Sequence, residues 1–198
     1  MSPRVTLRRL GQERGQSMVE FAMVLPFLMV IVLGVVEVGY ALLDQHVVTK
    51  LAREGSNLIS RDTSLQDARV ALASMSSRPV NFASGSTLIF SVIKRGGTTG
   101  TANFNRIYLY QRHQFGTLSA TSVVQTAGPG SFNGPPNYEA VNADNNTSLQ
   151  VTNLPANLVS MPGAMIYITE IFSTHPLITP FDRFGVSVPS RLYSIAYF

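Results

Sequence analysis

The stretch Gly15-Gln16-Ser17-Met18-Val19-Glu20-Phe21 stands between an arginine-rich leader and a long apolar run. It places a glycine at the edge of a membrane-like segment and a carboxylate five residues later. A carboxylate at that position is costly in lipid and gives an ordinary membrane anchor no advantage. Its presence is explained if the chain is cut after Gly15 and the segment from Gln16 onward packs beside other copies. The stretch therefore predicts a processed component of an assembly rather than a catalyst.

The apolar run from Phe21 to Leu43 has the composition of a transmembrane helix. It contains 14 leucine, isoleucine, valine and phenylalanine residues. Their insertion is worth about −4 to −8 kcal/mol, which outweighs one carboxylate near the membrane edge at about +3 kcal/mol. Sixteen uncharged residues separate Glu20 from Glu37, and they form about 25 Å of helix, which nearly spans the hydrocarbon core. We therefore expect one membrane span over residues 16–43, with the two glutamates near opposite borders.

Two other interpretations of this run remain open. A buried core helix of a globular domain has a similar apolar content. A secretory signal peptide would be cut near Gly39-Tyr40-Ala41, although the run is longer than a typical signal-peptide core and contains Glu37.

The formal net charge of +4 is concentrated at the N-terminus. Residues 1–15 hold four arginines and one glutamate, so this leader carries +3 and the rest of the chain +1. Because the arginines precede the span, we expect a cytoplasmic N-terminus and place residues 44–198 across the membrane. The nearly neutral remainder offers no clustered basic face, so we expect no nucleic-acid partner. The chain has no cysteine, so packing and backbone hydrogen bonds must hold its outer part together.

A helical region is predicted to continue beyond the membrane, over residues 44–78. Apolar side chains recur at intervals of three and four, which predicts one helix from about Ser17 to Ser60. Its outer stripe consists of Val48, Leu51, Ala52, Gly55, Leu58 and Ile59. Residues 61–63 predict a break, and the capping-box spacing of Ser64 and Asp67 predicts a second helix that Pro79 ends. The apolar residues of that second helix are Leu65, Ala68, Leu72 and Met75.

Residues 79–198 are predicted to be rich in β-structure, because the apolar period changes to two. The predicted strands are 87–94, 106–113, 164–172 and 191–197. The first two are joined by a glycine-rich turn, and the last two by a connection that contains Pro176, Pro180 and Pro189. Four strands can form an antiparallel sheet that is stable against a helix. We therefore expect the α+β class, with a long N-terminal helix, a short second helix and this sheet.

Between the two strand pairs, residues 116–163 are rich in glycine, serine, threonine, asparagine and proline. Only Glu139 and Asp144 are charged there. Such a long segment without clear periodicity predicts a functional surface loop or partial disorder. Short edge strands at 123–124 and 149–151 are compatible with its sequence.

The chain contains little that suggests catalysis. His46, His113 and His175 are far apart in the sequence, without metal-ligand spacing and without a cysteine to complete a zinc site. Residues 128–134 have the wrong glycine spacing for a phosphate-binding loop. Asp144 begins a row of oxygen ligands but lacks the glycine and distal glutamate of a calcium loop. We therefore expect no catalytic residue, no metal and no cofactor.

Glu20 has two possible roles after cleavage. The new amine of Gln16 is mostly protonated at neutral pH, because an α-amino group has a pKa of about 8. In a bundle of offset copies, the carboxylate of one chain can meet the ammonium of the next, which removes an unpaired buried charge. A glutamate that merely extends to the lipid headgroups explains its position equally well.

Three blocks of sequence stand out in combination: residues 15–26 (GQSMVEFAMVLP), 37–42 (EVGYAL) and 52–56 (AREGS). Together they resemble the TadE-like minor pseudopilins of tight-adherence (Tad/Flp) pili. The resemblance implies that a prepilin peptidase cuts between Gly15 and Gln16. Glu20 and Phe21 would then be the fifth and sixth mature residues and serve processing and assembly. Within the mature helix Pro26 would loosen the backbone, while Glu37 and Gly39 would lie at the membrane border or in helix packing.

The resemblance also implies a pilin-like fold and a set of partners. These are the prepilin peptidase, other pilins and minor pseudopilins, and an inner-membrane assembly platform. The chain would be a non-catalytic, single-pass protein of a bacterial inner membrane with a periplasmic or extracellular C-terminal domain, or part of the pilus, and would support adhesion or secretion. The alternatives are a membrane-anchored envelope enzyme that uses His113, Asp144 and His175, and a binding protein released near Ala41.

Overall fold

The computed structural model describes the backbone of residues 9–155, 158, 161–179 and 190–198, with side chains from residue 15 onward. The chain divides into two compact units. The first, here called the helix unit, consists of residues 1–42 and 177–187. The second, the sheet unit, consists of residues 43–176 and 188–198. Pro180 and Pro189 of the predicted connection lie outside the described residues.

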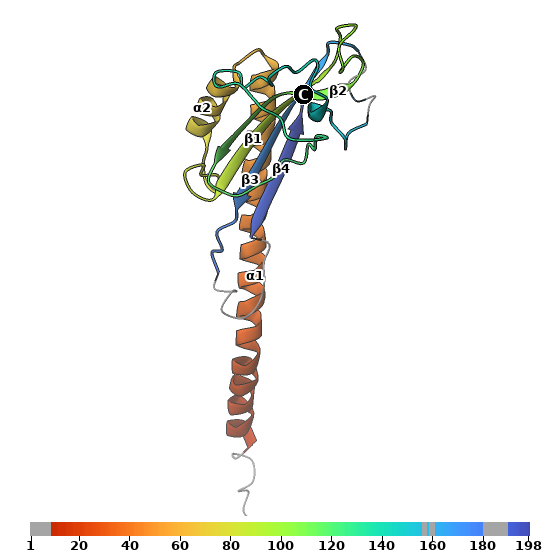
Figure 1. Ribbon diagram of the computed structural model, residues 1–198. Helices are drawn as coiled ribbons and strands as arrows, with labels where there is room; N and C mark the ends of the chain where they lie inside the picture. The colour runs from red at the N-terminus through yellow and green to blue at the C-terminus, as the bar shows by residue number, and fades with distance from the viewer. Residues whose placement is uncertain (1–8, 156–157, 159–160, 180–189) are drawn as a thin grey trace, which may run out of the picture. The chain divides into compact units, whose positions relative to one another are not determined.

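Helix α1 runs over Arg9–Ser60 (Figure 1). The predicted end at Ser60 is confirmed, whereas the helix begins earlier than predicted, within the arginine-rich leader. The predicted break follows at once, and Asp62 has a positive φ of 59°. Aspartate tolerates this left-handed conformation because its short polar side chain can form local hydrogen bonds. The chain can therefore turn sharply between the two helices.

Helix α2 spans Leu65–Met75 and starts at the predicted cap. The Ser64 hydroxyl accepts a hydrogen bond from the Asp67 amide at 3.1 Å and donates one to the Asp67 carboxylate at 2.7 Å. The helix ends before Pro79, because Ser76 is extended and its hydroxyl bonds to the Ala73 carbonyl at 2.8 Å. Of the four apolar residues predicted for this helix, Leu65, Ala68 and Leu72 are buried, whereas Met75 at its end is exposed.

One four-stranded antiparallel sheet forms the centre of the sheet unit, in the order β2-β1-β3-β4 (Figure 1). The strands are β1 (Ser86–Arg95), β2 (Ile107–Gly116), β3 (Met165–Thr174) and β4 (Arg191–Tyr197). All four predicted strands are therefore present, within three residues of their predicted bounds. The register shifts between Val92 and Ile93 and leaves Tyr110 as an extra residue of β2. The α+β prediction is confirmed.

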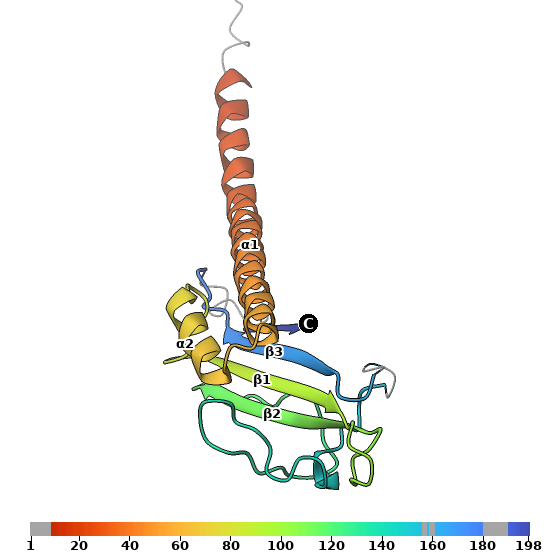
Figure 2. The ribbon, with the colours of Figure 1, turned by 90° about the horizontal axis from the view of Figure 1, so that it is seen from above.

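The outer part of α1 and all of α2 cover one face of this sheet (Figure 2). The largest buried cluster joins the predicted stripe of α1 to alternate residues of the strands, among them Leu88, Phe90 and Ile171. Gly55 permits the close approach of α1 to β3, because a Cβ atom there would lie 2.6 Å from the Thr169 Cγ2 atom. The Ser56 hydroxyl also donates to the Ala196 carbonyl of β4 at 2.9 Å. The helix is thus fixed to the sheet by packing and by a buried hydrogen bond.

The described part of the segment of residues 116–163 covers the opposite face of the sheet (Figure 2). Val124 and Val151 pack with Ile93 and Ile168 in a second cluster, and Leu149 packs with Tyr108 in a third. The segment contains the short 3-10 helix η1 (Thr147–Leu149) and an isolated bridge between Thr126 and Val151 rather than the suggested edge strands. It was expected to be a surface loop or partly disordered. Its described part instead supplies core residues, because few but well-placed apolar side chains suffice to cover a strand face.

Candidate functional site

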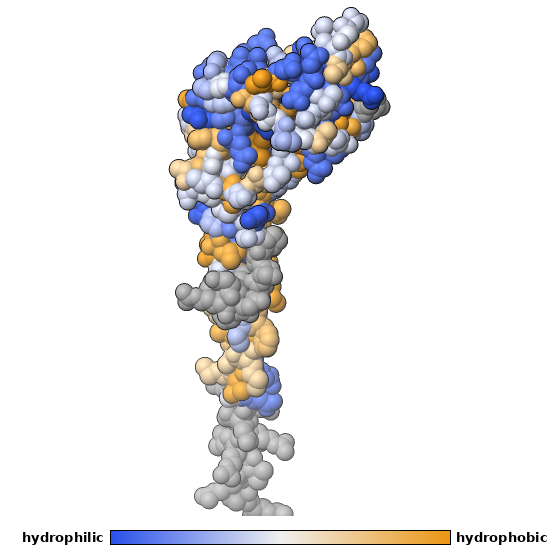
Figure 3. Space-filling model, viewed as in Figure 1, coloured by the Kyte–Doolittle hydropathy of each residue, from blue (hydrophilic) through white to orange (hydrophobic). Residues whose placement is uncertain are grey.

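The inner part of α1 exposes almost all of its apolar side chains. Between Met18 and Leu43, most large hydrophobic side chains are 40 to 76% exposed. Figure 3 shows hydrophobic side chains along this helix. The span Gly15–Ser60 is long and apolar enough to cross a membrane, and its most apolar stretch, with a mean hydropathy of 2.6, has no buried share. A helix that is apolar all round requires lipid or other helices as its surroundings, so this part of α1 is a candidate membrane anchor.

The residues predicted for cleavage and assembly lie on the first exposed turns of this helix. A Cβ atom added at Gly15 would meet no neighbouring group within 4 Å, and Phe21 is 64% exposed. The Gln16 side-chain amide donates to the Glu20 carboxylate at 3.0 Å, an i to i+4 contact. The structure therefore brings Gln16 and Glu20 together within one chain. Both side chains are exposed and remain accessible to another molecule.

Pro26 and Gly39 occupy exposed positions on the same helix. Pro26 lies inside α1, where it has no N–H to donate to the carbonyl four residues earlier. Gly39 has nothing within 4 Å of a built Cβ position. Neither residue therefore serves a close contact within the described part of this chain. Their surfaces are open to a neighbouring helix.

Glu37 differs from the other residues predicted for cleavage, assembly and helix packing because it is buried, with 1% exposure. Its carboxylate accepts hydrogen bonds from the Thr179 amide at 2.9 Å and from the Thr179 hydroxyl at 2.6 Å. The Ile178 amide makes a longer contact at 3.3 Å. All three donors belong to the helix unit and point at one side chain. The sequence predicted Glu37 at a membrane border, but it contained no signal for this partner segment 141 residues away.

A second buried acid lies two turns further along α1, within the sheet unit. Asp44 is 6% exposed, and its Oδ2 atom lies 2.7 Å from Nδ1 of His175, which is 3% exposed. From the sequence, His175 was expected to be an isolated histidine, and Asp44 was not identified as its partner. One signal was available, because positions 37 and 44 differ by seven residues and so share a helix face.

The residues proposed for an envelope enzyme do not come together. The His113 ring stacks on Tyr138 at a centroid distance of 3.9 Å, while Asp144 accepts a hydrogen bond from the Tyr108 hydroxyl at 2.7 Å. His175 pairs with Asp44 instead. Within the part of the chain that is described, no group of three or more histidines and carboxylates could hold a metal ion. The three residues thus have separate structural contacts rather than a shared pocket.

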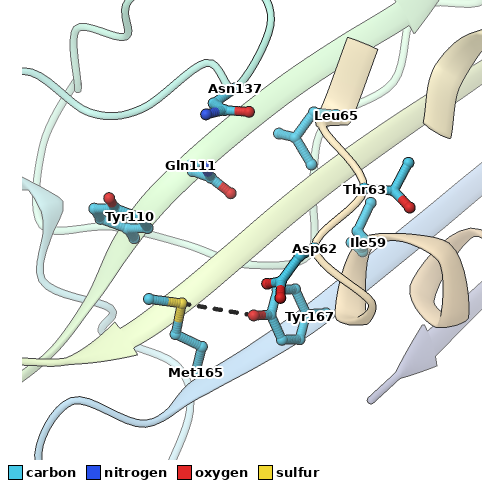
Figure 4. Close-up of a pocket in the computed structure, with 9 residues that line it drawn as sticks. All are labelled: Ile59, Asp62, Thr63, Leu65, Tyr110, Gln111, Asn137, Met165 and Tyr167. Atoms are coloured by element: carbon cyan, nitrogen blue, oxygen red, sulfur yellow. Dashed lines mark hydrogen bonds between the residues drawn. The ribbon is translucent and has the colours of Figure 1, made fainter. Parts of the chain in front are cut away.

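One cavity of the sheet unit, of about 200 Å³, lies where α1 ends, between the helices and strands β2 and β3 (Figure 4). It is lined by Ile59, Asp62, Thr63, Leu65, Tyr110, Gln111, Asn137, Met165 and Tyr167. Burial raises the pKa of Tyr167, and Asp62 raises it further. Burial and Glu139 likewise raise the pKa of Tyr110. Both phenols are therefore protonated at neutral pH and act as hydrogen-bond donors, not as bases.

A buried polar network attaches the segment of residues 116–163 to the sheet. Glu170 of β3 is fully buried and accepts hydrogen bonds from the Ser122 hydroxyl and from the Val123 amide, the latter at 2.8 Å. The guanidinium of Arg112 donates to Ser122 at 3.1 Å and to the Val124 carbonyl at 2.9 Å. Burial lowers the pKa of Arg112, and Glu170 opposes this effect. No pattern in the sequence indicated these partners of Glu170.

Comparison with known proteins agrees with the blocks noted in the sequence. Residues 15–57 match the family model described as TadE-like protein. This range contains Glu20, Pro26, Glu37 and Gly39, together with the outer stripe of α1 as far as Gly55. No curated protein and no solved structure matches the chain. The TadE-like family consists of structural components associated with Tad pili, and residues 15–57 of this chain are similar to that family.

Proposed function

We propose that the chain is a minor pseudopilin of a tight-adherence pilus or a related secretion apparatus. A prepilin peptidase cuts it between Gly15 and Gln16. The mature helix then stays in the inner membrane, with the sheet unit on the outer side, until it joins other pilins on the assembly platform. The protein has no catalytic role of its own and supports pilus assembly and surface adhesion.

The observation that carries this proposal is the inner part of α1, which matches the TadE-like family and exposes its apolar side chains all round. Such a surface is stable in lipid and equally stable against other apolar helices. A pilin requires both environments, because it moves from the membrane into a helical bundle. An enzyme anchor requires only the first.

The proposed cleavage position is physically suitable for proteolysis. Gly15 lies inside α1, with no atom within 4 Å of a built Cβ position. Glycine in a helix interior destabilises the helix by about 0.5–1 kcal/mol relative to alanine. The helix is therefore locally weakened at this bond. Cleavage there would leave the amine of Gln16 one turn from Glu20.

The test is the intact mass of the membrane-extracted protein, made in cells with and without prepilin peptidase. We expect a loss equal to residues 1–15 only when the peptidase is present, and no loss for Gly15→Ala. Gly39→Ala is the matched control, because it changes an equally exposed glycine of the same helix and should leave processing intact. A mature N-terminus near Leu42 would instead identify a released binding protein. An uncut chain with normal pili would refute the proposal.

A further inference from the structure

We infer that residues 177–179 form a second lipid contact of this chain, at the headgroup–acyl boundary on the side of the membrane away from the N-terminus. The Ile178 side chain enters the lipid, and Glu37 holds the segment against α1. This inference rests on the membrane span that the proposed function assigns to α1. It adds a lipid-binding site outside the helix itself.

The first step is the attachment of the segment to the helix. The Thr179 amide and hydroxyl donate to the Glu37 carboxylate at 2.9 and 2.6 Å, and the Ile178 amide approaches it at 3.3 Å. Both partners belong to the helix unit. Hydrogen bonds to a carboxylate are stronger than those between neutral groups. The segment is therefore fixed at the position of Glu37 along α1.

The second step is the depth of Glu37 in the membrane. The 16 residues between Glu20 and Glu37 form about 25 Å of helix, against a hydrocarbon core of about 30 Å. With Glu20 at one border, Glu37 lies at or just inside the other. A lone carboxylate at this depth is unfavourable. The donors of Thr179 and Ile178 replace the water that it would otherwise lose, so the contact is suited to the membrane boundary.

The third step is the surface that the segment presents. Ile178 is 43% exposed although its backbone amide faces Glu37, and Leu177 beside it is half-buried. Val35 and Val38 flank Glu37 in the sequence of α1 and are 69 and 58% exposed. Ile178 thus adds an exposed apolar side chain to those of the helix. Headgroup-level lipid accommodates such a surface better than water, because burying apolar area is favourable.

The experiment uses the absence of tryptophan from the chain, so that Ile178→Trp provides a single fluorescent probe. The full chain is placed in vesicles of phosphatidylethanolamine and phosphatidylglycerol, with bromine at a shallow or a deep acyl position as quencher. Val35→Trp is the control within the span, and Val141→Trp, at an exposed position of the sheet unit, is the control outside lipid. We expect blue-shifted emission from Ile178→Trp, with stronger quenching by shallow than by deep bromine.

Three results would overturn the inference. If Val35→Trp is quenched but Ile178→Trp behaves like Val141→Trp, the segment lies outside lipid although the membrane span is correct. If Ile178→Trp is blue-shifted, unquenched and sensitive to the protein-to-lipid ratio, it contacts a second copy rather than lipid. Lack of quenching of Val35→Trp itself would refute the span and, with it, this inference.

Variants of the attachment test the role of Glu37. Glu37→Gln in the Ile178→Trp background retains the shape but turns an amide toward the N–H donors, so we expect loss of quenching. Thr179→Val removes only the hydroxyl donor and should cause a smaller loss. Glu20→Gln is the matched control and should leave the signal unchanged. Unaltered quenching in both Glu37→Gln and Thr179→Val would show that Glu37 does not hold the segment.

Discussion

Glu20 and Glu37 lie at the two ends of the same apolar run, yet their surroundings in the structure are opposite. Glu20 is exposed, and the hydrogen bond described for it is a contact from Gln16 one turn away. Glu37 is almost completely buried and accepts hydrogen bonds from a segment more than 140 residues further along the chain. The two carboxylates near lipid are thus stabilised in different ways. One glutamate is satisfied by its own fold, and the other remains available to a neighbouring molecule.

The same contrast extends along the rest of α1. Its inner part exposes apolar side chains, and a Cβ atom added at Gly39 would meet no group within 4 Å. Its outer part buries Asp44 against His175 and brings Gly55 close to Thr169. We therefore expect substitutions of exposed residues in the inner part to affect assembly, and substitutions of buried Glu37 and of the outer part to affect folding.

The largest expected effect comes from exchanging the two glutamates separately for glutamine. We expect Glu20→Gln to reduce the yield of sheared pili by roughly tenfold or more, because its proposed partner lies in another chain. The thermal midpoint in detergent should remain that of the wild type. Glu37→Gln should lower that midpoint, because the donors of Thr179 lose a charged acceptor. Wild-type piliation of Glu20→Gln would show that Glu20 is only a headgroup anchor.

The next effect concerns Asp44. Asp44→Ala leaves the buried ring of His175 without this partner, so we expect the free energy of unfolding of the sheet unit to fall by about 2–3 kcal/mol. Processing after Gly15 should be unaffected. The measurement is chemical denaturation followed by circular dichroism. His46→Ala, an exposed neighbour on the same helix, serves as control, and an equal loss in both variants would contradict a specific role for the pair.

A matched pair of glycines provides a smaller effect. Gly55→Ala should destabilise the sheet unit by about 1–2 kcal/mol, because the new methyl group meets Thr169 and Leu72. Gly39→Ala should be neutral or stabilising by at most about 1 kcal/mol, since only helix propensity changes. Thermal unfolding of both variants distinguishes the packed part of α1 from the exposed part. Equal behaviour would mean that the outer part of α1 is not closely packed.

The smallest effect is a pH dependence of the sheet unit. Burial, and secondarily Arg69, lowers the pKa of His113 from 6.5 to about 4. Between pH 4 and 6.5, His113 therefore binds more protons in the unfolded chain than in the folded one. The contribution of neutral His113 to stability is complete above about pH 6.5 and decreases as the pH falls toward 4. Because the ring is only half-buried, solvent screening reduces the expected loss to about 1 kcal/mol. His113→Phe keeps the stacking on Tyr138 and should flatten the dependence of unfolding on pH. His46→Gln should retain it.

Much of the fold could be predicted from local patterns. The stripe from Val48 to Ile59 predicted which face of α1 is buried, and Ser64 with Asp67 predicted the start of α2. The segment of residues 116–163 could not be predicted in this way, because its buried side chains, such as Val124 and Leu149, follow no regular period. Its attachment through Glu170 depends on residues 47 and 48 positions apart. Of the candidate site, the residues around Gly15 and Glu20 could be identified, but the surroundings of Glu37 could not.

The sequence by itself determined the apolar run, its bordering glutamates, the continuation of α1, the four strands and the resemblance over residues 15–56. These features depend on composition and on short periods, which local physical chemistry specifies. The tertiary structure alone decided which acids are satisfied inside the chain. Glu37 and Glu20 have similar flanks, and only the return of residues 178 and 179 to α1 distinguishes them. A hydrogen-bond partner so far along the chain is set by the folded path of the backbone, not by spacing.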